Sequence, residues 1–182
     1  YRVHEEPDTE KVNALNKFLF NFGYKIKSNK EKVYPKAFAV VLEKVKGREE
    51  EMVVSNLILR TLKVARYESE NKGHFGIASK YYCHFTSPIR RYPDLQIHRI
   101  IKEYLRGRLK EERILHYKDI LPQVCKHASE MERRADEAER ETDKLKKAEY
   151  MTAHMDEEYD GVISGIMAYG IYAVSYTHLT LP

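Results

Sequence analysis

Apolar residues recur at helical spacing along most of the first 155 positions. Between positions 12 and 22 they lie three or four residues apart, and Gly23 follows as a residue that can end a helix. The polar, glycine-containing stretch 68–80 predicts a loop, and the aromatic stretch 81–85 favours an extended segment. The helical periodicity returns in three further segments of ordinary length, 35–47, 52–67 and 93–107.

From about residue 119 to residue 155 the pattern predicts one long helix. Its apolar stripe is narrow and rich in alanine, and its flanks are dense with Glu, Asp, Lys and Arg, which favours ion pairs four residues apart. We interpret this segment as a solvated helix that lies against a core, and a self-associating coiled coil is the alternative.

The periodicity changes to alternation after Tyr159. The segments 159–166 and 169–174 predict two strands joined by a tight connection. We place a domain boundary at this change, with one domain over 1–157 and a second, incomplete domain over 158–182. The predicted fold class is α+β, mainly helical and followed by a truncated β segment.

Composition narrows the class of protein. With 42% hydrophobic and 33% charged residues, the 182-residue chain has the balance of a globular domain. Its longest apolar run, 37–42, is far shorter than the roughly 20 residues of a membrane span, so no membrane partner is expected. The net charge of +4 permits an anionic partner. Cys83 and Cys125 are far apart and favour a reducing, cytoplasmic location over a disulfide framework.

The two ends of the chain suggest an excised piece of a longer protein. The chain begins with Tyr1, without an initiator methionine, in a sequence typical of the middle of a domain. The strand pattern stops after Val174, and 175–182 is interpreted as a foreign end. The expected oligomeric state is a monomer.

The candidate chemistry is concentrated at residues 84–94. A Ser-Pro turn presents Arg90 and Arg91, with Tyr92 and His84 beside them. Guanidinium groups match phosphate oxygens in a bidentate geometry, so the pattern predicts a phosphate-binding turn. The alternative is that one arginine pairs with a core carboxylate and the other is solvated.

The run His-Phe-Thr-Ser-Pro-Ile-Arg-Arg-Tyr-Pro-Asp at 84–94, followed by His98 and Arg99, resembles the signature of the RNB family of ribonuclease II-like exoribonucleases. The resemblance extends over nearly the whole chain, to about Val174. It implies processive 3′-to-5′ hydrolysis of single-stranded RNA to nucleoside monophosphates, with magnesium as the cofactor. By motif position it implies that Arg90 balances charge at the phosphorus, and that Arg91 holds a neighbouring phosphate or a structural carboxylate.

Members of this family bind metal through a short aspartate-rich motif that lies upstream of the matched region. The aspartates of this chain are scattered, and we assign none of them to a metal site. Asp94 belongs to the arginine signature and is interpreted as structural. We therefore expect the C-terminal part of an RNB catalytic domain without its metal ligands, inactive by itself. The aspartates are Asp8, Asp94, Asp119, Asp136, Asp143, Asp156 and Asp160.

Three further residues are candidates for RNA contact. The family resemblance suggests that Glu139 faces the RNA channel, with a solvated helix charge as the alternative. The segment after residue 159 resembles the start of an OB-type RNA-binding domain, and Tyr169 and Tyr172 are its base-stacking candidates. A different class of protein, a helical RNA-binding module without chemistry, is the alternative to the enzyme.

Overall fold

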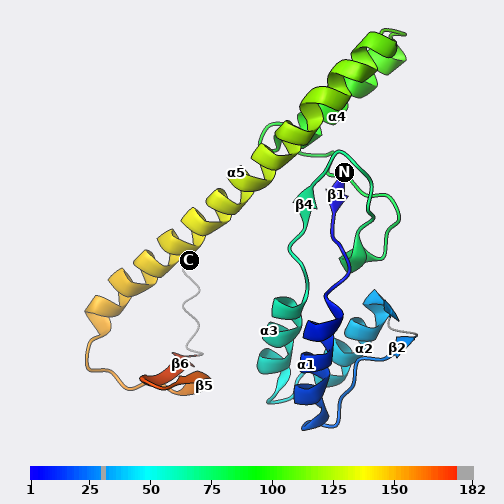
Figure 1. Cartoon of the computed structure of the whole chain (residues 1–182). Helices are drawn as coiled ribbons and strands as arrows, with labels where there is room; N and C mark the ends of the chain where they lie inside the picture. Colours follow the sequence, from blue (N-terminus) through cyan, green and yellow to red (C-terminus); the bar gives the residue numbers. More distant parts are fainter. Residues whose placement is uncertain (30–31, 176–182) are drawn as a thin grey trace. The chain divides into compact units, whose positions relative to one another are not determined.

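The computed structural model describes residues 1–29 and 32–175 (Figure 1). The chain divides into two compact units, 1–131 and 132–182, and the long helix α5 runs from one into the other. Among the described residues, no helix is both long and apolar enough to cross a membrane.

The first unit begins with three packed helices, α1, α2 and α3, shown in blue to cyan in Figure 1. Pro35 stands in the first turn of α2, where its missing N–H costs nothing. Short strands accompany the helices, and β2 pairs with β3 in antiparallel fashion. The elements are β1 (Arg2–Val3), α1 (Thr9–Phe20), β2 (Ser28–Asn29), β3 (Lys32–Val33), α2 (Pro35–Val45), α3 (Glu51–Thr61) and β4 (Arg66–Tyr67).

The apolar faces of these helices make the main core. Leu19 of α1 and Ile26 of the following segment are both 0% exposed, and burial of each contributes about 2 kcal/mol. Asn16 fastens this segment to α1: its amide oxygen accepts from the Ile26 N–H at 2.7 Å, and its amide nitrogen donates to the Ile26 carbonyl at 3.2 Å. The core cluster comprises Val12, Leu15, Leu19, Tyr24, Ile26, Val33, Phe38, Val41, Val45, Val54, Ile58 and Phe75.

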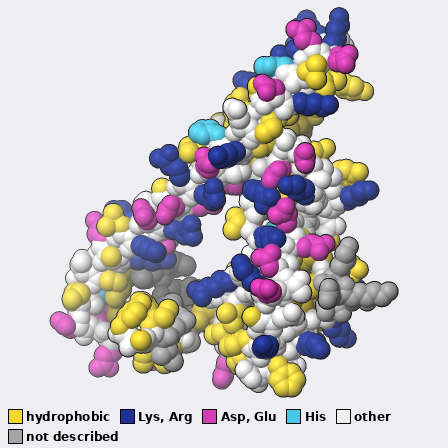
Figure 2. Space-filling view, viewed as in Figure 1, with side chains coloured by type: hydrophobic (Ala, Val, Ile, Leu, Met, Phe, Trp, Pro, Cys, Tyr) yellow, Lys and Arg dark blue, Asp and Glu magenta, His cyan; other side chains and the backbone are white. Residues whose placement is uncertain are grey.

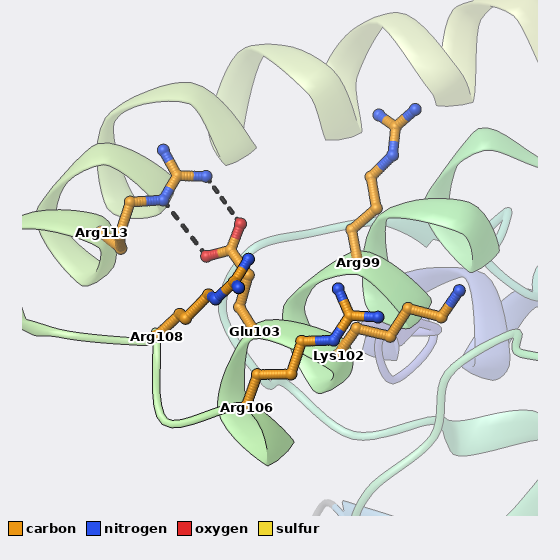
Figure 3. A pocket seen from close by; sticks show the side chains of 6 residues that line it. All are labelled: Arg99, Lys102, Glu103, Arg106, Arg108 and Arg113. Carbon is orange, nitrogen blue, oxygen red and sulfur yellow. Dashed lines mark hydrogen bonds and ion pairs between the residues drawn. The ribbon is translucent and has the colours of Figure 1, made fainter.

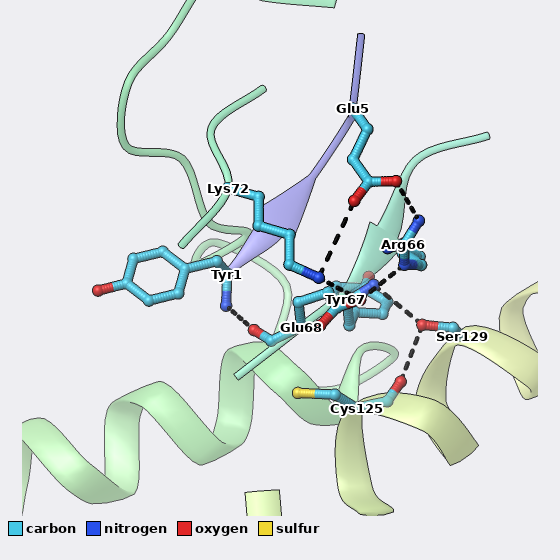
Figure 4. Close-up of polar contacts among 8 residues, drawn as sticks. All are labelled: Tyr1, Glu5, Arg66, Tyr67, Glu68, Lys72, Cys125 and Ser129. Atoms are coloured by element: carbon cyan, nitrogen blue, oxygen red, sulfur yellow. Dashed lines mark hydrogen bonds and ion pairs between the residues drawn. The ribbon is translucent and has the colours of Figure 1, made fainter. Parts of the chain in front are cut away.

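The helix predicted over 52–67 is too long, because its last residues form a strand. Helix α3 ends at Thr61, and β4 pairs with β1 in antiparallel register, Arg2 opposite Tyr67. The Tyr67 N–H donates to the Ser129 hydroxyl at 2.9 Å, and that hydroxyl donates to the Cys125 carbonyl of α5 (Figure 4). These long-range partners replace the helical hydrogen bonds that the local periodicity favours.

Ion pairs close the β1–β4 ribbon from the side (Figure 4). Arg66 pairs with Glu5 at 3.2 Å and with Glu68 at 2.7 Å, and Lys72 lies 3.6 Å from Glu68. The hydrogen bonds from Arg66 lower the pKa of both carboxyl groups, so both remain ionised at neutral pH. The N-terminal ammonium of Tyr1 donates to the Glu68 carbonyl at 2.7 Å.

The rest of the first unit is a loop with a 3-10 turn, η1 (Phe75–Ile77), then α4 (Tyr92–Leu105) and the start of α5 (Glu111–Met151). The aromatic stretch 81–85 forms no strand; one backbone bond, from the Arg2 N–H to the Tyr82 carbonyl, joins it to β1. The predicted helix 93–107 is confirmed as α4. The predicted helix 119–155 is confirmed as α5, which begins earlier than expected.

The second unit holds the C-terminal part of α5, the short turn η2 (Thr152–His154) and an antiparallel hairpin, β5 (Gly161–Met167) with β6 (Gly170–Ser175). The two predicted strands are therefore confirmed, and their register shifts once, between Ile163 and Gly165. The expected boundary at 157/158 falls between η2 and β5 and stays a prediction. Apart from Ser175, the predicted foreign end lies outside the described residues. The fold class is α+β, as predicted.

Candidate phosphate-binding site

The turn from Ser87 to Arg91 is built around one buried carboxylate. Asp94, in the first turn of α4, is 0% exposed. Its Oδ2 accepts the Ser87 N–H at 2.9 Å and the Arg91 Nη2 and Nε at 2.8 and 3.1 Å. The Arg91 N–H donates to the Ser87 carbonyl at 3.0 Å and closes the turn. We call these residues the Ser87–Arg91 turn.

The pairing with Asp94 gives the two adjacent arginines different roles. The guanidinium of Arg91 is committed to a core carboxylate, which supports the structural one of its two expected roles. A buried charge of this kind is stable only when it is paired, so the contact fixes the turn relative to α4. The structural interpretation of Asp94 agrees with its burial and its three hydrogen bonds.

Arg90 has the opposite environment. Its side chain is exposed and makes no hydrogen bond or ion pair with any residue that the structure describes. It follows Ile89, whose side chain is fully exposed at the tip of the turn. Arg90 is therefore a guanidinium on a rigid support whose donors are available to an anion.

A ring stack holds the segment before the turn against α4, and a cation–ring contact lies within α4 itself. His98 stacks on Phe85, with ring centroids 4.3 Å apart and 17° between the planes, and its Nε2 lies 2.8 Å from the Phe85 carbonyl oxygen. Tyr92 is half exposed; the guanidinium carbon of Arg99 lies 5.8 Å from its ring centroid. No contact was predicted for His98, and its place in the family signature after 84–94 was the available signal.

His84 contacts Tyr67 of β4 rather than standing free beside the arginines. Its Nδ1 is 2.9 Å from the Tyr67 hydroxyl, and its ring meets the rings of Tyr67 and Tyr82 edge-on. The edge contacts continue from Tyr82 to His74 and from His74 to His4. Burial lowers the pKa of His74 and of His4, which keeps both imidazoles neutral at pH 7. This aromatic row supports the loop that leads into the site.

Gly76 is required where the loop crosses β1. Its N–H donates to the His4 Nδ1 at 3.0 Å, and a Cβ on this residue would lie 2.8 Å from the same atom. Only glycine fits without displacement of the His4 ring, so this glycine is explained by close approach rather than by a turn.

The remaining predicted contacts belong to the second unit. Glu139 is exposed on α5. Tyr169 and Tyr172 are 80% and 52% exposed on the hairpin, with their rings edge-to-face at 6.5 Å. Both tyrosines thus present open ring surface, and their role in RNA contact stays a prediction.

The carboxylates do not converge on a metal site in the described part of the chain. No group of three or more His, Cys, Asp or Glu side chains there could hold a metal ion. Asp94, the carboxylate beside the two arginines, has Oδ2 occupied by Ser87 and Arg91. The described residues therefore do not fit the magnesium cofactor that the family resemblance implies.

Asp94 thus holds Arg91 at the start of α4 and leaves the neighbouring Arg90 exposed. The sequence model of the RNB domain matches residues 1–107, a span that includes the whole Ser87–Arg91 turn and α4. The chain belongs to the RNB domain family.

Relatives of known identity agree with this assignment. The chain is 41% identical over 172 residues to ribonuclease R 1 of Lactococcus lactis, covering 94% of this chain and 21% of that protein. It superposes on Mycoplasma genitalium RNase R in complex with ribose methylated single-stranded RNA with a TM-score of 0.87, at 28% identity, over 97% of this chain and 28% of that one. Yeast Ssd1, described as a pseudonuclease, gives a TM-score of 0.57 at 25% identity, over 71% and 16% of the two chains.

Proposed function

We propose that this chain is part of a 3′-to-5′ exoribonuclease that hydrolyses single-stranded RNA to nucleoside monophosphates. The observation that carries the proposal is Arg90, an exposed arginine on a turn that Arg91 and Asp94 hold rigid. The relatives support it, since they are named ribonuclease R and one of them is complexed with single-stranded RNA. Because the chain spans about a quarter of these proteins, the activity is proposed for the whole protein.

The proposed role of Arg90 is electrostatic. Negative charge develops on the phosphoryl oxygens in the transition state of phosphodiester hydrolysis, and a donor already in place stabilises that charge without reorganisation. The two contacts from Arg91 Nε and Nη2 to Asp94 Oδ2 supply the required rigidity from the protein side. Arg90 has no protein carboxylate among the described residues that would compete with a phosphate for its donors.

Magnesium remains a proposal for the whole protein. The described residues do not bring the necessary carboxylates together, so we derive no step of the reaction from metal bound to them. We propose that aspartates elsewhere in the protein bind it. We also propose a cytoplasmic location, which the two free cysteines, Cys83 and Cys125, support.

The test is Arg90→Ala in the whole protein, measured as release of nucleoside monophosphates from single-stranded RNA. Turnover should fall roughly 100- to 1000-fold, the usual loss when one preorganised charge-stabilising donor is removed. The matched control is Arg60→Ala, an exposed arginine on α3 outside the turn, which should keep turnover within about threefold. A loss smaller than about threefold for Arg90→Ala would remove Arg90 from the reaction.

RNA binding without hydrolysis is the second candidate function. The structural likeness to yeast Ssd1, a pseudonuclease, favours it, since a related fold occurs in a protein described as lacking nuclease activity. The assay above separates the two candidates: a whole protein that binds single-stranded RNA but releases no nucleotide with magnesium present is a binding module.

A further inference from the structure

A basic pocket lies where α4 ends and α5 begins (Figure 3). Its volume is about 410 Å³, within the range of ordinary ligand pockets, but its walls are charged rather than apolar. We call it the α4–α5 pocket. It is lined by Arg99, Lys102, Glu103, Arg106, Arg108 and Arg113.

Glu103 is the single carboxylate among the residues that line the pocket, and it already accepts hydrogen bonds from neighbouring side chains. Glu103 receives two hydrogen bonds from Arg113, at 2.8 and 3.2 Å, and one from the Tyr117 hydroxyl at 2.8 Å (Figure 3 shows the first two). The bonds from Arg113 and Tyr117 lower the pKa of Glu103, which stays ionised at neutral pH. Glu103 thus neutralises Arg113 and ties α5 to α4.

The other cations of the pocket have no such partner. Lys102, Arg106 and Arg108 are exposed, and their side chains make no hydrogen bond or ion pair within the described ranges. Within the same ranges, the Arg99 guanidinium lies 5.8 Å from the Tyr92 ring centroid and donates to the Tyr92 hydroxyl at 3.5 Å. Over much of the face in Figure 2, Lys and Arg side chains alternate with Asp and Glu, whereas the α4–α5 pocket is lined by five cations and one carboxylate.

The backbone between the helices is rigid and holds the cations in place. Gly107 has a φ of +64°, its N–H donates to the Tyr104 carbonyl at 3.0 Å, and the Arg108 N–H donates to the Glu103 carbonyl at 2.8 Å. This pair of bonds is the Schellman ending of a helix. Because these backbone bonds already satisfy carbonyl groups at the end of α4, the side chains of Arg106 and Arg108 are not needed to cap it.

Like charges held this close destabilise the free protein. Arg99, Lys102, Arg106 and Arg108 line one pocket, and repulsion between like charges gathered at one place opposes folding. An anion that binds there removes the repulsion and stabilises the folded state by mass action. A cluster that costs stability without an anion and gains it with one has the properties of an anion-binding site.

We propose that the α4–α5 pocket binds phosphate groups of an RNA strand, as a backbone contact separate from the Ser87–Arg91 turn. The identity of the strand as RNA rests on the proposed function. Arginine and lysine side chains are the usual ligands of backbone phosphates. Helix α4 has 14 residues, so at a rise of about 1.5 Å per residue about 21 Å separate the Ser87–Arg91 turn before its start from Arg106 and Arg108 just past its end. That distance exceeds the screening length of about 8 Å at physiological salt, and the two sites should contribute to binding independently.

The test compares two charge-matched variants of the chain. One combines Arg106→Gln with Arg108→Gln; the other combines Lys118→Gln with Lys126→Gln, two exposed cations of α5 that do not line the pocket. Binding of a fluorescent oligouridylate of about 20 nucleotides is titrated over a range of salt. Each phosphate contact to a single strand contributes about 0.7 to the slope of log affinity against log salt. The pocket variant should lose about 1.4 from the slope, and the control should keep it within about 0.3.

Thermal unfolding provides the check on folding and on the ligand. The pocket variant should unfold at the same temperature as the unmodified chain or higher, because two like charges have been removed. RNA should raise the unfolding temperature of the unmodified chain more than inorganic phosphate does at equal phosphate concentration. If inorganic phosphate raises the unfolding temperature as much as RNA does, the assignment of the ligand as an RNA strand is overturned. If both variants lose the same amount from the salt slope of RNA affinity, the assignment of the pocket as the binding site is overturned.

Failure of this inference differs from failure of the proposed function. If the whole protein shows no hydrolysis but RNA binding depends on Arg106 and Arg108, the pocket is supported as an RNA-binding site and the proposed exoribonuclease activity is refuted. If Arg90→Ala abolishes hydrolysis while the pocket variant binds RNA with an unchanged salt slope, the proposed exoribonuclease activity is supported and the pocket is refuted as an RNA-binding site.

Discussion

At the scale of single residues, Asp94 has the largest energetic consequence in the Ser87–Arg91 turn. Asp94→Asn removes the charge that pairs with Arg91 and leaves that guanidinium, whose side chain is 19% exposed, without its partner. We expect the free energy of unfolding to fall by about 3 kcal/mol, the usual cost of breaking a largely buried ion pair from one side. The measurement is urea unfolding at neutral pH.

Asp119→Asn is the control for this change, because Asp119 is an exposed carboxylate on α5 and its loss should alter stability by less than about 0.5 kcal/mol. A cost below about 1 kcal/mol for Asp94→Asn would show that the contact does not stabilise the turn.

The two adjacent arginines show which residue contacts could be predicted from the sequence and which could not. Arg90 and Arg91 are chemically identical neighbours, so the sequence left open which of them contacts a core carboxylate. The structure brings the Arg91 guanidinium to 2.8 Å from Asp94 and leaves Arg90 exposed. The contacts of His98 and Ser129 were not predicted, because each joins segments whose approach depends on the fold.

At the scale of elements, the β5–β6 hairpin should be the least protected part of the chain. A two-stranded hairpin is marginal in water unless it packs against a third element, and Ile163, Met167 and Ile171 are more than half exposed. We expect its amide hydrogens to exchange much faster than those of the helices between Thr9 and Tyr150. Hydrogen exchange read by mass spectrometry measures this directly.

The matched internal reference for that experiment is α1, whose apolar face lies in the main core. Protection of the hairpin equal to that of α1 would mean that the two strands pack on another part of the protein.

The predicted element boundaries were wrong where contacts with distant residues determine where a helix begins or ends. Helical spacing continues past Thr61, yet the chain leaves the helix so that Tyr67 can pair with Arg2 and donate to Ser129. Helix α5 begins at Glu111, eight residues before the predicted start, where the contacts of Arg113 with Glu103 fasten it to α4. Periodicity alone cannot show such partners, because they lie outside any local window.

At the scale of the whole molecule, we expect this chain by itself not to hydrolyse RNA. Arg90 can stabilise charge on a phosphate, but activation of the attacking water in this chemistry requires metal ions held by several converging oxygen ligands. No three such side chains converge within the described residues. The measurement is magnesium-dependent release of nucleotide from 3′-labelled single-stranded RNA by the purified chain.

Arg90→Ala in the same chain identifies any contaminating nuclease, since release that is identical in both versions does not come from this protein. Release that requires magnesium and disappears in the variant would contradict the expectation, and would mean that a metal site assembles from residues interpreted here as structural.

The sequence by itself determined the features that depend on local spacing. Helical periodicity, the alternation after residue 159, and the run at 84–94 are properties of neighbouring residues, and they predicted the α+β class, the hairpin and the arginine turn. Only the tertiary structure decided that Arg91 pairs with Asp94 and Arg90 does not, and that α4 and α5 together form a basic pocket. Those outcomes depend on which polar groups become buried and on which distant segments of the chain contact them. Burial and such contacts are properties of the folded molecule.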